Sequence, residues 1–450
     1  MIEPHPLEVL VGMELYSTEA KGVGGRLKTR FEDFRVEEIL PDGSNLELQK
    51  WPDESDPAAA VEFTIDGDKR KYVRFTVQKL GLSTMDVSTI LATELGLPRH
   101  LVSYAGLKDK RALTVQSMSV PAGASQSLAK LKLSKIVVRD MEYVRQPVQI
   151  GDLWGNRFAI LLRELESSCT DSMGIAQELA GKLILNYFGV QRFGVTRPDT
   201  HMVGKTAVEG DFEGALRIML TATSKYESEE LTGARQAIAQ NMTVNQKILN
   251  RFPRGLRYER IVIKHLMEHP GDYRSAFTKI PPRIQTLFVH SYQSYLFNRL
   301  ISQRLRSGFS IQSPMPGDFL IQLNQTHSGR DSWLFVTERN LEQRRDLVSS
   351  DAYGVAVPLP GYSTKTPPSP QSEMLQKMLK DEGITLMDFR SSENKALDSP
   401  GSLHLLSIKV PELNPRCDDD GLWLQFSLRK GSYATIVMRE LMKNHPINRV

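Results

Sequence analysis

A single acidic residue, Asp109, lies within a basic turn of the sequence, residues 105–111 (AGLKDKR). Lys108, Lys110 and Arg111 flank it, and nearby positive charge favours the ionised form of a carboxyl group. An ionised carboxylate can act as a nucleophile or as a base, but it has no proton to donate. A solvated turn, in which the carboxylate only pairs with adjacent lysines, fits the same local pattern.

The segments around this turn are predicted to be regular and rigid. Residues 72–79 (YVRFTVQK) alternate like a strand, and Ser83 is a suitable N-cap for a helix over 84–95. Residues 101–104 and 112–120 are rich in β-branched side chains, which predicts extended structure on both sides of the turn. The carboxylate is therefore expected on a loop held by regular elements, where functional residues are often found.

Several further blocks of sequence follow one another along the chain. They are EDFRVEE (32–38), GLKDKRALTVQ (106–116), GNRF (155–158), NYFGVQRFG (186–194), QSYLFN (293–298), LPGY (359–362) and KGSYATIVMRE (430–440). This ordered set resembles the TruD family of tRNA pseudouridine synthases, in which an Ala-Gly-(Leu/Thr)-Lys-Asp-(Lys/Arg) turn carries the catalytic aspartate. The resemblance covers nearly the whole chain. The chain length and long middle section are more similar to archaeal than to bacterial members.

The resemblance implies an α+β fold with two parts. Residues 1–200 together with 395–450 would form a pseudouridine synthase-like catalytic domain, with a mixed, mainly antiparallel sheet flanked by helices. Residues 201–394 would form an inserted α/β TRUD-type domain that helps to grip tRNA. A length of 450 residues agrees with two domains, because it exceeds what one ordinary core accommodates.

The sequence also predicts individual helices. Apolar spacing favours one helix over about 170–185, which would end in the block that begins at Asn186. Further helices are expected over 208–220, 228–240, 245–250, 259–268, 286–305, 338–349, 372–382 and 431–443.

The resemblance implies that the protein isomerises uridine to pseudouridine, at position 13 of tRNA, without a cofactor. Asp109 would be the catalytic residue, with Lys108 beside it. Pseudouridine synthases place an aromatic ring against the target base, and in this family that residue is a phenylalanine, which corresponds to Phe188. Asn186 could bond the edge of the base. Without the resemblance, these aromatic residues would be interpreted as core packing after a helix.

Positive charge supplies the remaining candidate site residues. By analogy with the wider superfamily, a cation should pair with Asp109, and Arg192 and Arg439 are the candidates. Lys430 is expected to line the same cleft. Contacts with tRNA phosphates are predicted for Lys28, Arg74, Lys110, Arg111, Arg254 and Arg257. Solvated surface charge is the alternative for each, and Glu37 and Glu38 are likewise expected to be solvated at a strand end.

Composition limits the other classes of protein. The net charge is +4, the isoelectric point about 8.8 and the mean hydropathy -0.31, and no apolar run is long enough to span a membrane. We therefore expect a cytoplasmic protein. The resemblance implies tRNA as its partner and no obligatory protein partner. Cys169 and Cys417 are far apart in sequence, which argues against a disulfide framework and against thiolate metal sites.

Two acidic or histidine motifs could suggest a metal, and we expect neither to bind one. His265 and His269 are spaced for one helix face but lack the His-Glu-x-x-His pattern, so an ordinary surface helix is expected. The run Asp418–Asp420 ends at a glycine and is predicted to be a hairpin turn.

Two other functions compete with isomerisation. A phosphodiesterase would need several carboxylates around Mg²⁺. A non-catalytic RNA-binding protein would account for the basic and aromatic residues without any chemistry. The sequence leaves open whether Asp109 attacks the base, attacks the sugar or removes a proton, which tRNAs are substrates, and the oligomeric state.

Overall fold

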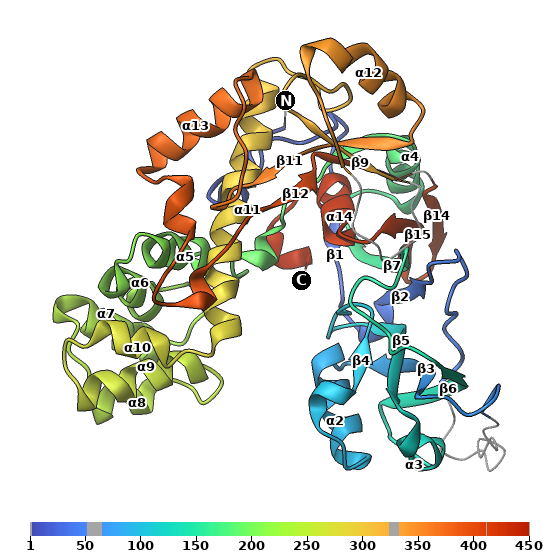
Figure 1. Cartoon of the computed structure of the whole chain (residues 1–450), viewed down its shortest axis with the longest axis horizontal. Coiled ribbons are helices and arrows are strands. Elements are labelled where there is room, and N and C mark those ends of the chain that lie inside the picture. The colour runs from blue at the N-terminus through green and yellow to red at the C-terminus, as the bar shows by residue number, and fades with distance from the viewer. Residues whose placement is uncertain (1, 52–64, 324–332, 411, 450) are drawn as a thin grey trace.

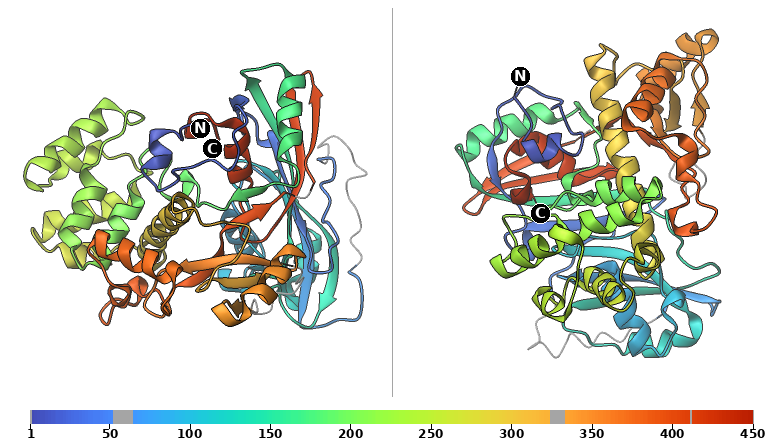
Figure 2. Two further views of the ribbon diagram at one scale, coloured as in Figure 1. Left: turned by 90° about the horizontal axis from the view of Figure 1, so that it is seen from above. Right: turned by 90° about the vertical axis from the view of Figure 1, so that its left-hand side faces the viewer.

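The computed structural model describes residues 2–51, 65–323, 333–410 and 412–449. A large sheet with two helices on it, α2 (Thr84–Glu94) and α3 (Ser125–Ala129), lies on one side of the molecule (Figure 1). A group of helices lies on the other side, and the view from above in Figure 2 again shows the two at opposite ends. The long helix α11 (Pro282–Arg306) lies between them.

The large sheet is mixed and mainly antiparallel, as predicted. Among the pairings between named strands of this sheet in the described residues, only that of β2 with β5 is parallel. The α+β class is confirmed. Its strand order is β14 (Asn414–Asp418), β15 (Gly421–Arg429), β7 (Gly155–Leu165), β2 (Phe34–Ile39), β5 (Leu113–Pro121), β3 (Tyr72–Leu80) and β6 (Ile136–Val144), with β1 (Gly24–Arg26) on β7 and β4 (Ser103–Tyr104) on β5.

Strand β7 lies inside the sheet between β15 and β2, and the side chains in its middle are apolar on both faces. Ile160, Leu161 and Leu162 are all buried. Gly155 begins the strand, and a Cβ there would lie 2.1 Å from the carbonyl oxygen of Leu428. The absent side chain therefore lets the start of β7 pair closely with the end of β15, on the side of the sheet where the candidate site lies.

Helix α2 has the cap that its sequence predicts. The Ser83 hydroxyl accepts from the Asp86 N–H, and the Asp86 carboxylate accepts from the Ser83 N–H. Its apolar face packs on β3 and β5 in a second hydrophobic core that includes Val73, Val87 and Leu91. The helix thereby supports the strand that follows the basic turn.

The helix expected over 170–185 is shorter than predicted. Helix α4 (Cys169–Leu179) ends at Leu179, and Gly181 adopts a left-handed φ of 76°. Residues Leu183–Leu185 then form β8, which pairs with β13 (Ser407–Lys409). Pairing with a distant strand overrides the local helical pattern.

Cys169 and Cys417 form a disulfide, although their distance in sequence argued against a disulfide framework. Cys169 begins α4 and Cys417 lies in β14, and the two elements pack together with their Cα atoms 6.0 Å apart. Their separation of 248 positions in the sequence gave no sign that the fold brings these two elements side by side.

The helical group contains α5 (Thr200–Val208), α6 (Phe212–Thr221), α7 (Glu229–Asn241), α8 (Gln246–Arg251), α9 (Arg257–Glu268) and α10 (Tyr273–Thr278). The helix expected over 208–220 begins only at Phe212, because Gly210 adopts a φ of 79° and Asp211 caps α6 through the N–H of Gly214. Val208 instead ends α5, which was not predicted. Helix α10 was not predicted.

A second sheet packs beside α11. Its order is β10 (Trp333–Phe335), β9 (Phe319–Gln322), β11 (Tyr353–Leu359) and β12 (Ser402–Leu405), with α12 (Leu341–Ser349) and α13 (Pro370–Glu382) nearby. Strand β12 lies beyond residue 395 yet pairs with β11. We therefore propose that the inserted part extends to about residue 405, while its start near 201 stays as predicted. The C-terminal α14 (Ala434–Met442) returns to the large sheet.

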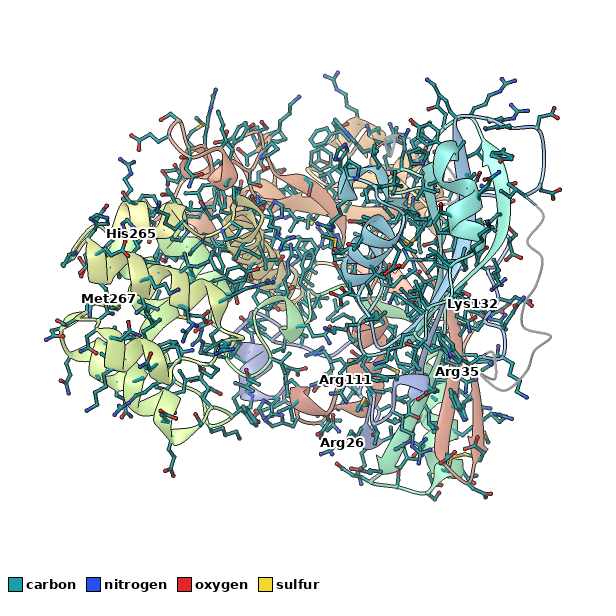
Figure 3. All side chains as sticks on the ribbon, turned by 90° about the horizontal axis from the view of Figure 1, so that it is seen from below. Arg26, Arg35, Arg111, Lys132, His265 and Met267 are labelled. Carbon is teal, nitrogen blue, oxygen red and sulfur yellow. A yellow bond between two sulfur atoms is a disulfide. The ribbon has the colours of Figure 1, made fainter. Side chains whose placement is uncertain are left out.

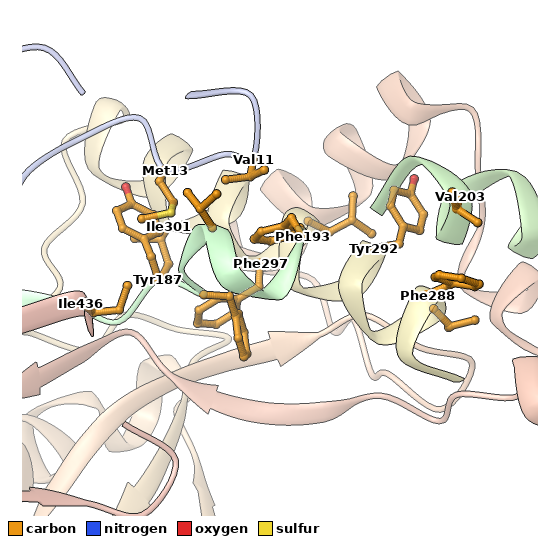
Figure 4. Close-up of a cluster of buried hydrophobic side chains, with 14 of the residues drawn as sticks. Val11, Met13, Tyr187, Phe193, Val203, Phe288, Tyr292, Phe297, Ile301 and Ile436 are labelled. Atoms are coloured by element: carbon orange, nitrogen blue, oxygen red, sulfur yellow. The ribbon is translucent and has the colours of Figure 1, made fainter. Parts of the chain in front are cut away.

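One continuous apolar core connects α11 with the large sheet. Figure 4 shows Tyr187, Phe193, Tyr292 and Phe297 in this core, together with Met13 from the N-terminal segment. That segment includes α1 (Pro6–Val9). The second sheet and α11 are thus packed on the part that contains the large sheet rather than tethered to it.

Among the described residues, no helix is long and apolar enough to cross a membrane.

The disulfide should contribute to stability. Replacing Cys169 by Ala should lower the free energy of unfolding by roughly 2–4 kcal/mol, because the cross-link restricts the unfolded chain. Chemical unfolding of the oxidised wild type, the reduced wild type and Cys169→Ala measures this. The reduced wild type should match the variant, and the variant should not respond to reductant. Identical curves for all three samples would contradict a stabilising cross-link.

Candidate active site

Asp109 lies in the loop between β4 and β5, and its partner is Lys28. Lys28 Nζ is 2.9 Å from Asp109 Oδ1. The lysine side chain is only 3% exposed, whereas that of Asp109 is 40% exposed. The carboxylate is thus held from beneath by a buried cation and faces solvent. Within the described residues, its Oδ2 makes no hydrogen bond.

The position of Lys28 is itself constrained. Its backbone has a φ of 53°, a left-handed conformation that side-chain-bearing residues adopt at a cost. Arg111 donates to its carbonyl oxygen at 2.7 Å, and its ammonium lies 4.3 Å from the centre of the Phe34 ring. Lys28 was predicted to meet tRNA phosphate. That is wrong, because its buried ammonium is occupied by Asp109.

Lys108, which lies in the basic turn itself, is the second buried lysine of the site. Its Nζ lies 2.6 Å from Glu38 Oε2, and both side chains are buried. Glu38 Oε1 also accepts from the N–H of Ser117 at 2.9 Å. The expectation that Glu38 is solvated is therefore wrong. A buried ion pair with its remaining oxygen bonded fixes the turn against β2 and β5.

Lys79 is the third buried lysine and supports the turn through its backbone. Its Nζ donates to the carbonyl oxygens of Asp109 at 2.9 Å and Leu82 at 2.6 Å. Burial lowers the pKa of Lys79 to about 7, with the charge of Asp109 opposing the shift and that of Lys108 adding to it.

A cavity of about 440 Å³ opens beside the carboxylate. Its walls come from the basic turn, from β2 and β7, and from the segment before α14. The lining residues include Phe34, Lys108, Asp109, Asn156, Gln191, Lys430 and Tyr433. Lys430 Nζ donates to the carbonyl oxygen of Gly151 at 3.3 Å, which agrees with its predicted place in the cleft.

The aromatic turn around Phe188 lies behind this cavity. The Phe188 ring is buried, stacks on His404 at 4.6 Å between ring centres, and lies 6.1 Å from the Tyr433 ring. Its backbone is held by Asn298 of α11, which accepts from the Phe188 N–H at 2.8 Å and donates to the Phe188 carbonyl at 2.9 Å. Tyr433 lines the cavity, together with Phe34 and Phe158, whereas Phe188 does not.

Asn186 and Arg192 leave polar atoms free next to this stack. Asn186 Nδ2 lies 3.0 Å from His404 Nε2 and donates to the Leu405 carbonyl, but its buried Oδ1 has no partner among the described residues. The same holds for Arg192 Nε. Burial lowers the pKa of His404 to about 4, and Arg192 adds to the shift, so this imidazole is neutral at pH 7.

Arg439 lies elsewhere, so its expected pairing with Asp109 is wrong. It is buried within α14 and contacts Glu8 at 2.8 Å, and it donates to the carbonyl oxygens of Leu15 and Met13. Arg192 does not pair with Asp109 either, and its guanidinium lies 6.0 Å from the Phe188 ring centre. The motif that contains Arg439 contributes Lys430 and Tyr433 to the cavity instead.

Comparison with known proteins agrees with this geometry. The family model described as "tRNA pseudouridine synthase D (TruD)" matches residues 10–441. This chain belongs to the TruD family. A protein described as "Probable tRNA pseudouridine synthase D" from Methanosarcina acetivorans is 32% identical over 99% of each chain. One with the same description, numbered 1, from Methanocaldococcus jannaschii is 33% identical over 96% of this chain and 99% of its own.

A solved structure supports the same assignment. A crystal structure from Methanosarcina mazei described as TruD superposes with a TM-score of 0.78 at 31% identity, over 99% of this chain and 100% of its own. These relatives are archaeal, as the chain length predicted. As a TruD family member, the protein is an isomerase of the tRNA pseudouridine synthase class.

The residues predicted to contact tRNA in this TruD chain occupy two surfaces. Lys110 and Arg111 are exposed on the basic turn, and Arg74 is partly exposed on β3, where it pairs with Glu142. Arg254 and Arg257 are exposed on the helical group. Figure 3 shows Arg111 on the sheet side and His265 on the helical side.

The two motifs that could have suggested a metal lie as follows. His265 contacts Asp272 at 3.2 Å, and the rings of His265 and His269 are 4.8 Å apart. The run Asp418–Asp420 forms the predicted turn between β14 and β15. In the part of the chain that the structure describes, no three His, Cys, Asp or Glu residues are grouped as a metal site would require.

Three residues of this site were missed from the sequence. Tyr433 lies within a block of the family pattern and could have been chosen as an aromatic residue next to Lys430. In the sequence, Lys79 is only one of several basic residues on a segment that alternates like a strand. His404 carries no signal, because it lies between leucines in an ordinary alternating strand.

The low pKa of Lys79 predicts a pH dependence of stability. Below pH 7 the lysine is protonated in both folded and unfolded chains. Between about pH 7 and 10.5 the unfolded chain binds more protons, because an exposed lysine titrates near 10.4. The free energy of unfolding of the wild type minus that of Lys79→Met should therefore increase from pH 7.5 to 9.5 in urea titrations.

The exposed Lys182 provides the control for this measurement. Replacing it by Met should give a difference from wild type that stays constant over the same pH range. A constant difference for Lys79→Met as well would show that Lys79 remains protonated in the fold.

Proposed function

We propose that this protein converts a uridine of tRNA to pseudouridine with Asp109 as the catalytic residue. The observation that carries the proposal is the setting of this carboxylate. It is paired on one oxygen with the buried ammonium of Lys28 and borders a cavity of about 440 Å³. The family indicates the reaction, and the geometry supports this residue as its agent.

The isomerisation breaks the N-glycosidic bond, rotates the uracil and joins it to the sugar again through C5. No atoms are gained or removed, and no electrons are transferred overall, so the reaction needs no cofactor. The step that Asp109 performs is attack on the base, attack on the sugar or removal of a proton from the sugar. Each of these needs an ionised carboxylate, which the Lys28 ammonium favours.

The groups behind the cavity suit a uracil ring. Uracil presents an N–H donor between two carbonyl acceptors. The unpartnered Asn186 Oδ1 could accept from that N–H, and Arg192 could donate to a carbonyl. Tyr433 at the cavity wall would stack on the base, with Phe188 and His404 as the layer behind it. In this arrangement Tyr433, rather than Phe188 as expected from the sequence, makes direct contact with the target base.

The tRNA would contact both ends of the molecule. Lys110 and Arg111 lie on the basic turn and Arg74 on β3 of the same sheet, whereas Arg254 and Arg257 lie on the inserted helical part. A binding surface that spans both would grip the tRNA body while one uridine enters the cavity. Family resemblance supports position 13, in the D-arm, as the target.

Replacing Asp109 by Asn should abolish pseudouridine formation while leaving tRNA affinity nearly unchanged, since the substitution removes the charge but little volume. The assay incubates the protein with unmodified tRNA transcripts in the presence of EDTA and maps pseudouridine at each uridine. Asp419→Asn, in an exposed turn, is the matched control and should retain full activity. The position of the modified uridine tests the assignment to position 13.

Other results of this assay point to other functions. Equal activity of wild type and Asp109→Asn would refute the catalytic assignment. Binding without modification by either protein, over a panel of transcripts, would favour a non-catalytic RNA-binding protein. Cleavage of the RNA that EDTA prevents would indicate a phosphodiesterase.

Replacing Arg254 and Arg257 together by Ala should weaken tRNA binding and reduce its dependence on salt. Removing one arginine that binds a phosphate should lower the slope of log K against log salt by about one. Affinity measured between about 50 and about 300 mM salt tests this. The double variant Arg339→Ala/Arg345→Ala, which removes the same charge from exposed positions near α12, should keep the wild-type slope. An unchanged slope for the first pair would exclude it from the interface.

A further inference from the structure

Two large apolar side chains beside the candidate site are unusually exposed. Leu107 is 69% exposed and Ile150 is 73% exposed. Within the described residues, these are the highest values of any large hydrophobic side chain. Leu107 lies two positions before Asp109, and Ile150 lies in the loop between β6 and β7. Exposed apolar side chains that occur together beside a site point to a binding role.

The two loops that carry them are joined to each other. The N–H of Gly151 donates to the carbonyl of Ala105 at 2.8 Å. Ala105, Val148 and Leu153 form a small buried cluster between the loops. The exposed side chains thus stand on a packed base.

This double loop borders two cavities. Leu107 and Leu153 line the cavity that contains Asp109. Ile150 and Val148 line a neighbouring cavity of about 490 Å³, together with Tyr104 and the exposed Arg99. Leu107 and Ile150 therefore lie at the boundary between the Asp109 cavity, proposed to hold the target base, and the neighbouring cavity.

The charge around the pair favours RNA as the occupant of this surface. Arg99, Lys110 and Arg111 are exposed nearby in sequence and fold. A cationic border around an apolar tip matches the phosphates and base faces of an RNA strand. An apolar protein partner would find this border unfavourable.

A base that leaves its stack creates a gap between its neighbours. Nucleic-acid-binding proteins commonly fill such gaps with apolar side chains inserted between base steps, which offsets part of the unstacking cost. Leu107 is placed for this because it is fixed to the same turn as Asp109, so the inserted side chain and the reacting carboxylate keep a constant separation.

We propose that Leu107, supported by Ile150, is an apolar wedge that enters the tRNA base stack beside the target uridine and holds the uridine in the Asp109 cavity. The inference rests on the proposed function. Leu107 would be a positioning residue, since it touches neighbouring bases and takes no part in bond making. Its effect should appear in the rate of modification and in the unstacking of the neighbouring base, with little effect on overall tRNA affinity.

The first measurement is the single-turnover rate of pseudouridine formation in tRNA. Leu107→Ala should slow it about tenfold, the order expected when one stacking interaction is removed, and Ile150→Ala should slow it less. Leu107→Met, which keeps an apolar side chain of similar length, should remain close to wild type. Leu10→Ala, which truncates an exposed leucine that does not line the cavity, should have no effect.

The second measurement follows the RNA directly and does not need turnover. A 2-aminopurine is placed beside the target uridine, and its fluorescence is recorded on binding to Asp109→Asn and to the double variant Leu107→Ala/Asp109→Asn. The fluorescence should rise with the first protein and rise much less with the second, at equal occupancy.

The results separate the wedge from the proposed function. Wild-type turnover by Leu107→Ala would overturn the wedge, and so would equal fluorescence with both proteins, even if the Leu107→Ala rate were low. If the wild type formed no pseudouridine in tRNA, the proposed function would fail first, and the wedge with it.

Discussion

Three lysine side chains are buried at one turn, and the rest of the site depends on which partner each ammonium group finds in place of water. A buried charge is tolerated only where an opposite charge or aligned carbonyl oxygens replace water. Lys28 uses Asp109, Lys108 uses Glu38, and Lys79 uses two backbone carbonyls, one of them from Asp109 itself. The turn therefore has one conformation that meets all three requirements, and this conformation presents a carboxylate to solvent.

The other half of the site is held by amide groups rather than by charge. Asn298 of α11 bonds both backbone groups of Phe188 and also the carbonyl of Val11. A single side chain thus joins the N-terminal segment, the aromatic turn and the long helix. Because that helix also packs on α5 and the second sheet, the tRNA-gripping part we propose is rigidly connected to the pocket for the base.

The sequence was sufficient to predict the elements that neighbouring residues determine. It was insufficient where the structure depends on contacts between distant segments. The basic turn, the capped helix α2, the central strand β7 and the hairpin at Asp418–Asp420 follow from neighbouring residues. The partner of Asp109 could not be chosen in this way, because Lys28, Arg192 and Arg439 are equally cationic and only packing decides which of them is buried beneath the turn. The same reason explains the missed disulfide and the helix that ends at Leu179, where pairing with β13 competes successfully with local helical preference.

The disulfide gives the chain an unusual covalent topology. Cys169 and Cys417 close a ring of peptide and sulfur that contains the aromatic turn, the helical group and the second sheet. The basic turn with Lys28 lies on one tail outside this ring, and Tyr433 lies on the other. A protease that cut a single peptide bond within the ring would leave every part of the site covalently attached to the rest. A cut in either tail, outside the ring, could separate Asp109 or Tyr433 from its partners.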